Sequence, residues 1–154
     1  MNYYARQTTT NSDGSPIFET AGDDLNERRV KTRLQEAWNC QLHRYPRLHA
    51  VDWYAERDQR VVGHVELKFR HHTVDVYPTV FLNFRKYASL LMLEVATGIP
   101  STFVVAYSDG VVKWIRASEV PVNDLRMAGT ARIVKSSSDR EPIFFIPIEA
   151  MTDL

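Results

Sequence analysis

The chain has 154 residues, which suits a single domain with one hydrophobic core. Hydrophobic residues make up 44% of the sequence and charged residues 25%, and no apolar run is long enough to cross a bilayer, so the composition is that of a globular protein. The 19 basic and 19 acidic side chains balance, and this lack of a basic excess argues against a protein that merely coats nucleic acid. An enzyme with a local acidic site fits the same balance.

The single cysteine, Cys40, excludes an intrachain disulfide and a cysteine-based zinc site. The first ten residues lack the apolar core of a secretory signal, so we expect a cytoplasmic protein. Residues 1–22 are rich in small and polar residues, and we expect them to form a flexible arm. Residues 23–154 then form the single domain.

The first predicted element is a helix that begins at Asp23. Asp23 or Asp24 can cap it, and apolar residues then recur at helical spacing. Glu27 shares a face with Val30 and Leu34. Its carboxylate therefore either caps its own helix or faces a charged site.

Three strands are predicted to follow as a meander, of which the second spans about 48–56 and the third about 60–70. The third strand alternates strictly between polar and apolar residues, so Glu66 and Lys68 stand side by side on its polar face. A turn between the second and third strands would bring Asp52 towards Glu66.

The second half of the chain is predicted to begin with a helix over residues 79–97, apolar around much of its circumference and therefore well buried. Gly98 ends this helix. Residues 117–130 are predicted to form a loop, with or without a short helix. The remaining predicted elements are strands at 102–107, 111–116, 131–135 and 143–148.

Two carboxylates beside an ammonium group form a constellation with a chemical use. Asp52 and Glu66 can hold a hard divalent cation through oxygen ligands. Such a cation lowers the pKa of bound water and stabilises charge on a phosphoryl group, while Lys68 can orient the water or neutralise the developing oxyanion. The alternative is an amphipathic strand whose Glu66 and Lys68 are merely solvated, because Glu-x-Lys triplets are common.

The order of these elements and charged residues resembles the PD-(D/E)XK nuclease superfamily, which has the restriction-endonuclease-like fold. The residues that carry the resemblance are Glu27, Asp52, Glu66, Lys68 and Lys86. It covers about residues 24–107, although Val51 stands where the superfamily's name has a proline. The implied fold is α/β, with a core of helix, three-strand meander, helix and strand, and a C-terminal β extension. Residues 77–114 also resemble small phage-encoded proteins related to Holliday-junction resolvases.

The resemblance implies a role for each of these residues. Asp52 and Glu66 match the two metal-binding carboxylates, and Lys68 matches the catalytic lysine. The backbone carbonyl of Leu67 and the carboxylate of Glu27 would complete the shell around Mg²⁺ or Mn²⁺. The implied function is an endonuclease that hydrolyses phosphodiester bonds in DNA. Selectivity for the structure of the DNA substrate is one form that this function can take.

Arg28, Arg29 and Lys86 are the predicted phosphate contacts, which would position DNA without reading its sequence. Two alternatives stay open. The first is an adaptor that keeps the fold and binds DNA or protein without cutting. The second is an assembly protein in which the apolar segment 143–146, expected at a sheet edge, forms a subunit interface. A homodimer fits each of these interpretations.

Overall fold

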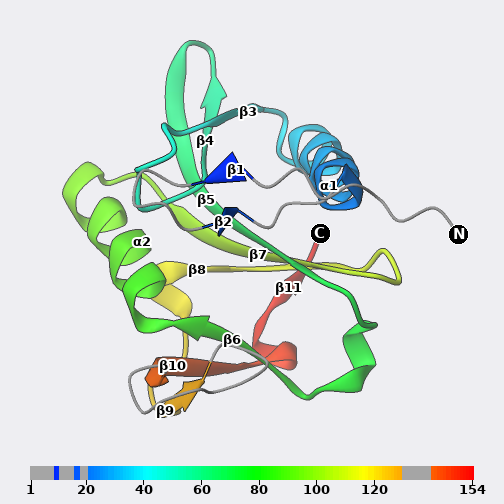
Figure 1. Cartoon of the computed structure of the whole chain (residues 1–154). Coiled ribbons are helices and arrows are strands. Elements are labelled where there is room, and N and C mark those ends of the chain that lie inside the picture. Colours follow the sequence, from blue (N-terminus) through cyan, green and yellow to red (C-terminus); the bar gives the residue numbers. More distant parts are fainter. Residues whose placement is uncertain (1–8, 11–15, 18–20, 130–139) are drawn as a thin grey trace, which may run out of the picture.

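The computed structural model describes residues 9–10, 16–17, 21–129 and 140–154. Its helices and strands, in chain order, are β1 (Thr9–Thr10), β2 (Pro16–Ile17), α1 (Ala21–Trp38), β3 (Gln41–Arg44), β4 (Trp53–Arg57), β5 (Arg60–Arg70), β6 (Thr79–Asn83), α2 (Phe84–Thr97), β7 (Ser101–Tyr107), β8 (Val112–Arg116), β9 (Leu125–Gly129), β10 (Arg140–Pro147) and β11 (Thr152–Asp153). A six-stranded main sheet has the order β11-β8-β7-β5-β4-β3, and a second sheet has the order β6-β10-β9 (Figure 1).

The main sheet contains the predicted meander, because β3, β4 and β5 pair in sequence as antiparallel neighbours. β5 and β7 then pair in parallel. A parallel pair requires a crossover connection, and the segment that contains α2 provides it. The sheet therefore combines an antiparallel half with one parallel junction, and β5 lies at that junction.

All seven residues of β7 are buried, because both faces of the main sheet are covered at this strand. Phe103 packs in one hydrophobic cluster with Leu90 of α2, and its neighbour Val104 packs in another cluster with Leu34 of α1. Since successive side chains of a strand point to opposite faces, α1 and α2 cover opposite faces of the sheet.

The hairpin between β4 and β5 fixes the register that matters for the charged residues. Asp58 and Gln59 form its turn with φ of 51° and 60°, the left-handed pair that a two-residue type I′ turn requires. Trp53 then pairs with Val65. The residue before Trp53 is thereby brought beside Glu66, as the alternation of the sequence predicted.

The predicted helix over residues 79–97 is wrong in its first five residues, which form β6. Val80 and Leu82 are buried and their neighbours are half-buried, so this segment has the alternation of a strand, and it pairs with β10. α2 begins after Asn83, whose side-chain oxygen accepts a hydrogen bond from the backbone N–H of Lys86 at 2.9 Å. The missed signal was this N-cap, because Asn83 interrupts the apolar residues on either side of it.

α2 ends as predicted at Gly98, where φ is 68° and the N–H group donates to the carbonyl of Glu94. The helix is less buried than predicted. Leu90 is fully buried, but Met92 and Val95 are 71% and 78% exposed. Apolar residues extend around the helix, yet only one side of it packs on the main sheet.

The second sheet corrects two further predictions and leaves a third untested. Residues 125–129, placed in a loop, form β9. The predicted strand at 131–135 lies outside the described residues, and the described partners of β10 are β9 and β6. Residues 143–146 therefore lie in a central strand and not at an edge, and three of the four are buried. The expected subunit interface on an open edge of this segment is wrong.

At the N-terminal end, α1 begins at Ala21, two residues before the predicted start. Within the predicted arm, β1 and β2 form a small antiparallel pair. Residues 21–22 of that arm begin α1, and its remaining residues lie outside the described part of the chain. No helix in the described part of the chain is both long and apolar enough to cross a membrane.

Candidate active site

Asp52 and Glu66 come together at the start of β4 and the middle of β5. The prediction placed Asp52 within a strand. In the structure it lies in the bend one residue before β4. Pro46 has no N–H group to continue the strand pairing, and the chain turns there. The loop closes where the backbone N–H of Tyr45 donates to the carbonyl of Asp52 at 2.9 Å. The Asp52 side chain accepts a longer hydrogen bond from the backbone N–H of Leu67 at 3.4 Å, which aims it at the polar face of β5.

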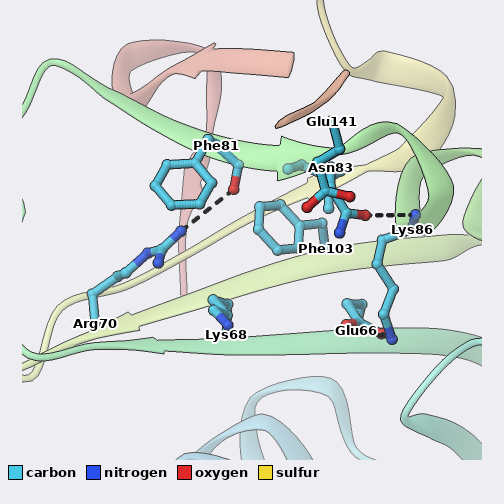
Figure 2. Close-up of a pocket in the computed structure, with 9 residues that line it drawn as sticks. Glu66, Lys68, Arg70, Phe81, Asn83, Lys86, Phe103 and Glu141 are labelled. Carbon is cyan, nitrogen blue, oxygen red and sulfur yellow. Dashed lines mark hydrogen bonds and ion pairs between the residues drawn. The ribbon is translucent and has the colours of Figure 1, made fainter. Parts of the chain in front are cut away.

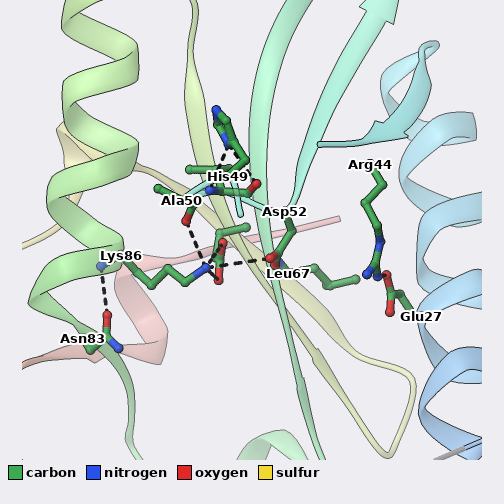
Figure 3. Close-up of polar contacts among 10 residues, drawn as sticks. Glu27, Arg44, His49, Ala50, Asp52, Leu67, Asn83 and Lys86 are labelled. Carbon is green, nitrogen blue, oxygen red and sulfur yellow. Dashed lines mark hydrogen bonds and ion pairs between the residues drawn. The ribbon is translucent and has the colours of Figure 1, made fainter. Parts of the chain in front are cut away.

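Lys86 reaches these carboxylates from the first turn of α2 (Figure 3). Its Nζ lies 3.0 and 3.1 Å from the two carboxylate oxygens of Glu66 and 3.8 Å from Oδ1 of Asp52. It also donates to the carbonyl oxygen of Ala50 at 3.0 Å. A single positive charge is therefore surrounded by oxygen atoms from the loop before β4 and from β5.

The pKa of Glu66 is raised to about 7. The largest cause is burial, since the residue is only 8% exposed and a carboxylate loses hydration there. The nearby charge of Asp52 raises the pKa further, and the ammonium group of Lys86 lowers it in part. An uncompensated negative charge is thus unfavourable at this position, and a cation beside it is favourable.

The donor set fits a hard divalent cation. The Lys86 ammonium acts as a stand-in ion, and every atom that contacts it here is an oxygen, the ligand type that Mg²⁺ and Mn²⁺ prefer. Over the described residues, no group of three or more carboxylate, imidazole or thiol side chains is arranged so that it could hold a metal ion. A cation would therefore rely on two carboxylates, with backbone carbonyls and water in addition. This is the usual arrangement for Mg²⁺, which keeps several waters.

A pocket of about 330 Å³ opens beside these groups, between β5 and the second sheet (Figure 2). Its lining residues are Glu66, Lys68, Arg70, Phe81, Leu82, Asn83, Lys86, Phe103 and Glu141. Lys68 is exposed on the same face of β5 as Glu66. Arg70 stacks over the ring of Phe81 at 4.2 Å and donates to its carbonyl at 3.4 Å. Three cations thus border a cavity with the buried carboxylate at one end, an arrangement suited to a phosphate group.

A family model described as "Phage putative PDDEXK endonuclease" matches residues 14–154. The chain belongs to this family. Among solved structures, Hjc, a Holliday junction resolvase from the archaeal hyperthermophile Archaeoglobus fulgidus, matches with a TM-score of 0.57 at 12% identity. The match covers 87% of this chain and 93% of the resolvase, and it shows that the fold is the predicted restriction-endonuclease-like fold. A comparison with curated proteins found no match.

Within this PDDEXK chain, three predicted site residues converge: Asp52, Glu66 and Lys86. Lys68 lines the same pocket, two residues along β5 from Glu66. Glu27 lies elsewhere, because its carboxylate forms an ion pair with Arg44 on the opposite side of Asp52 from Lys86 (Figure 3). Its role as a metal ligand stays a prediction.

The other predicted residues are placed less decisively. Arg28 and Arg29 are exposed on α1, so they are accessible, and their contact with DNA stays a prediction. Leu67 uses its backbone N–H to hold Asp52, and the role of its carbonyl group is likewise a prediction.

Sequence reasoning missed several residues of the pocket. Arg70 follows Lys68 by two residues in β5, so its side chain lies on the same face of the strand as those of Glu66 and Lys68. The alternation of that strand could have identified Arg70 as a site residue. Phe81 and Asn83 were hidden by the mistaken helix. Glu141 comes from β10, and no local signal connects that strand with β5.

Proposed function

We propose that this chain is a metal-dependent endonuclease that hydrolyses DNA phosphodiester bonds with Mg²⁺ or Mn²⁺. The observation that carries the proposal is the position of the Lys86 ammonium group, held by oxygens of Glu66, Asp52 and Ala50. The same oxygens would hold a divalent cation. Membership of a PDDEXK endonuclease family supports the chemistry.

Asp52 and Glu66 would be the metal-binding carboxylates, and the carbonyl of Leu67 would add a third oxygen. Glu27 would join them directly or through water, for which it would have to leave Arg44. When bound, the metal would act as a Lewis acid on the phosphoryl group and lower the pKa of a water molecule. The raised pKa of Glu66 is consistent with a buried carboxylate whose negative charge a bound cation would compensate.

Lys68 would orient the attacking water, because it stands beside Glu66 and lines the pocket. Arg70 and Lys86 would contact the phosphates on either side of the scissile bond. Arg28 and Arg29 would make further contacts with the DNA backbone from α1. The pocket is too small for a duplex, so only the sugar-phosphate of one strand would enter it.

The substrate and assembly are proposed from the fold. One solved structure that matches is a Holliday junction resolvase, which favours branched DNA as the substrate of this chain too. Cutting two strands of a branch symmetrically requires two related sites, and a homodimer would supply them. Such a phage-family nuclease would act in the cytoplasm, where its DNA substrate is found.

Cleavage assays on labelled four-way junctions, forks and duplexes test the proposal. With Mg²⁺ or Mn²⁺, we expect the wild-type chain to cut at least one of these, and a chelator to stop it. Glu66→Gln and Lys68→Met should each lower the rate by about a hundredfold or more. Glu119→Gln is the matched control, since Glu119 is exposed on the turn after β8. Full cleavage by folded Glu66→Gln would refute the assignment.

A non-catalytic adaptor is the second candidate, and one observation favours it. Lys86 already satisfies both carboxylates, so the cluster needs no metal to be stable. Calorimetric titration with Mn²⁺ separates the two functions. An adaptor would show no heat of metal binding and would bind DNA equally with and without the ion.

A further inference from the structure

The loop between β3 and β4 presents an apolar side chain to solvent beside the candidate site. Leu48 is 90% exposed, the largest exposed fraction among the large hydrophobic side chains of the described residues. The same loop ends at Asp52 and supplies the carbonyl of Ala50 that holds Lys86. An apolar group in this position has no packing role in the chain itself.

The loop that carries Leu48 also contributes to a series of four aromatic rings in contact. His49 stacks on Tyr45 with ring centroids 3.8 Å apart and an interplanar angle of 15°. Tyr45 also contacts Tyr54 at 5.0 Å, and Tyr54 stacks on His43 at 5.1 Å. All four rings are half-buried, so they retain accessible surface, in contrast to the buried Trp53. We refer to these four rings as the ring stack.

Hydrogen bonds connect the ring stack to residues next to the site. The Tyr45 hydroxyl is hydrogen-bonded to Nδ1 of His64 at 2.8 Å, and His64 is 3% exposed and two residues before Glu66. Nδ1 of His49 accepts a hydrogen bond from the backbone N–H of Val51 at 3.2 Å. Figure 3 shows His49 and Ala50 next to the contacts of Lys86. The rings therefore have a defined position relative to both carboxylates.

The charges of this segment favour a nucleic acid as the occupant. Residues 41–51 contain two arginines and two histidines and no acidic residue, and Arg44 among them is paired with Glu27 of α1. A partner that carries negative charge therefore fits this segment better than a second copy of the same segment, which contains no acidic residue. Unpaired bases stack on aromatic side chains in sequence-tolerant sites, and single apolar side chains insert between bases in proteins that separate or kink DNA strands.

We infer that residues 45–51 form a strand-separating loop, in which Leu48 inserts against a base pair and the ring stack receives the base that is released. This inference rests on the proposed nuclease function and narrows its substrate. The preferred DNA carries unpaired bases next to the cleaved phosphate, at a fork or branch, and continuous duplex is disfavoured.

The experiment measures binding without metal or cleavage. A forked DNA with the fluorescent base 2-aminopurine at its first unpaired position, and a duplex of the same sequence, are titrated with the full chain in a chelator. Wild type should bind the fork more tightly and quench its fluorescence. Leu48→Ser and His49→Ala should each weaken fork binding roughly fivefold or more, reduce the quenching, and leave duplex binding unchanged.

Val95→Ser is the matched control, because it removes an apolar side chain that is 78% exposed on α2, and it should bind like wild type. Leu48 is so exposed that its serine variant should unfold at the wild-type temperature. The inference is overturned if both loop variants bind the fork with wild-type affinity, as they would if this loop docks a protein. It is also overturned if wild type binds fork and duplex equally. Neither result affects the nuclease proposal, which fails separately if wild type binds no Mn²⁺ and cuts no DNA.

Discussion

Replacing Lys86 by methionine should tighten metal binding, although the change removes a residue of the candidate site. Methionine keeps most of the length of the side chain and deletes its charge. In the structure, the ammonium group occupies the space between Glu66 and Asp52, so a divalent ion has to displace it. Two like charges cannot share one set of oxygens at these distances.

The magnitude follows from what the displacement costs. Hydrogen bonds to a charged partner contribute about 1.5–3 kcal/mol each, and the Lys86 side chain is 35% exposed, so solvent screening places its contact with Glu66 at the low end. When a metal ion binds, the wild type loses about 1.5 kcal/mol of stabilisation from the Lys86–Glu66 contact, and Lys86→Met loses none. The dissociation constant for Mn²⁺ should therefore fall about tenfold.

Isothermal titration calorimetry at about pH 8 measures this directly, since Glu66 has a pKa of about 7 and is mostly ionised there. Arg85→Met is the control, because Arg85 is the neighbouring, exposed cation on α2. It lowers the charge of the helix equally without touching the carboxylates and should change affinity little. If Lys86→Met binds Mn²⁺ no more tightly than Arg85→Met, the ammonium does not compete with the ion and the reasoning fails.

Four further predictions concern pH and the elements that position the site. The affinity for Mn²⁺ should rise with pH up to about 7 and then level off, because the ion needs Glu66 ionised; calorimetry across this range should show a flatter profile for Glu66→Gln. The pKa of this carboxyl group is raised by folding, so the metal-free chain should lose stability as pH rises from about 4.5 to about 7, and thermal unfolding that is constant over this interval would contradict it. Asn83→Ala removes the cap of α2 and should cost about 1 kcal/mol in chemical denaturation, against no change for the exposed Asn123→Ala. Gly98→Ala should cost about 1–2 kcal/mol, entirely through its φ of 68°, because an added Cβ meets nothing within 4 Å; equal denaturation midpoints would show that the backbone relaxes.

The sequence predicted the site where local periodicity decides geometry. In β5, alternation alone placed Glu66 and Lys68 on one face, and the bounds of this strand agree with the prediction. Asp52 was expected beside Glu66 from the hairpin, and the pairing of Trp53 with Val65 confirms that proximity. These outcomes depend only on neighbours within one hairpin.

Prediction failed where tertiary contacts choose between two local structures. The apolar run from Thr79 suits a helix as well as a strand, and pairing with β10, about sixty residues later, selects the strand. The carbonyl of Ala50 accepts a hydrogen bond from Lys86 only because the loop before β4 lies next to the start of α2. Neither contact has a signature in the surrounding residues, because both partners are distant in sequence.

The contact between Lys86 and Ala50 also connects two proposals that were argued from different residues. Ala50 lies in the strand-separating loop, two residues after Leu48, and its carbonyl oxygen is held by the ammonium group that a metal would displace. Binding of the ion would therefore transfer the loop carbonyl from the ammonium group to the ion and release a positive charge next to the pocket for phosphate. Since linkage between two ligands is reciprocal, DNA that draws Lys86 towards a phosphate would in turn favour the ion. Metal and DNA should thus bind cooperatively in the wild type, and this cooperativity should be lost when the ammonium group is absent.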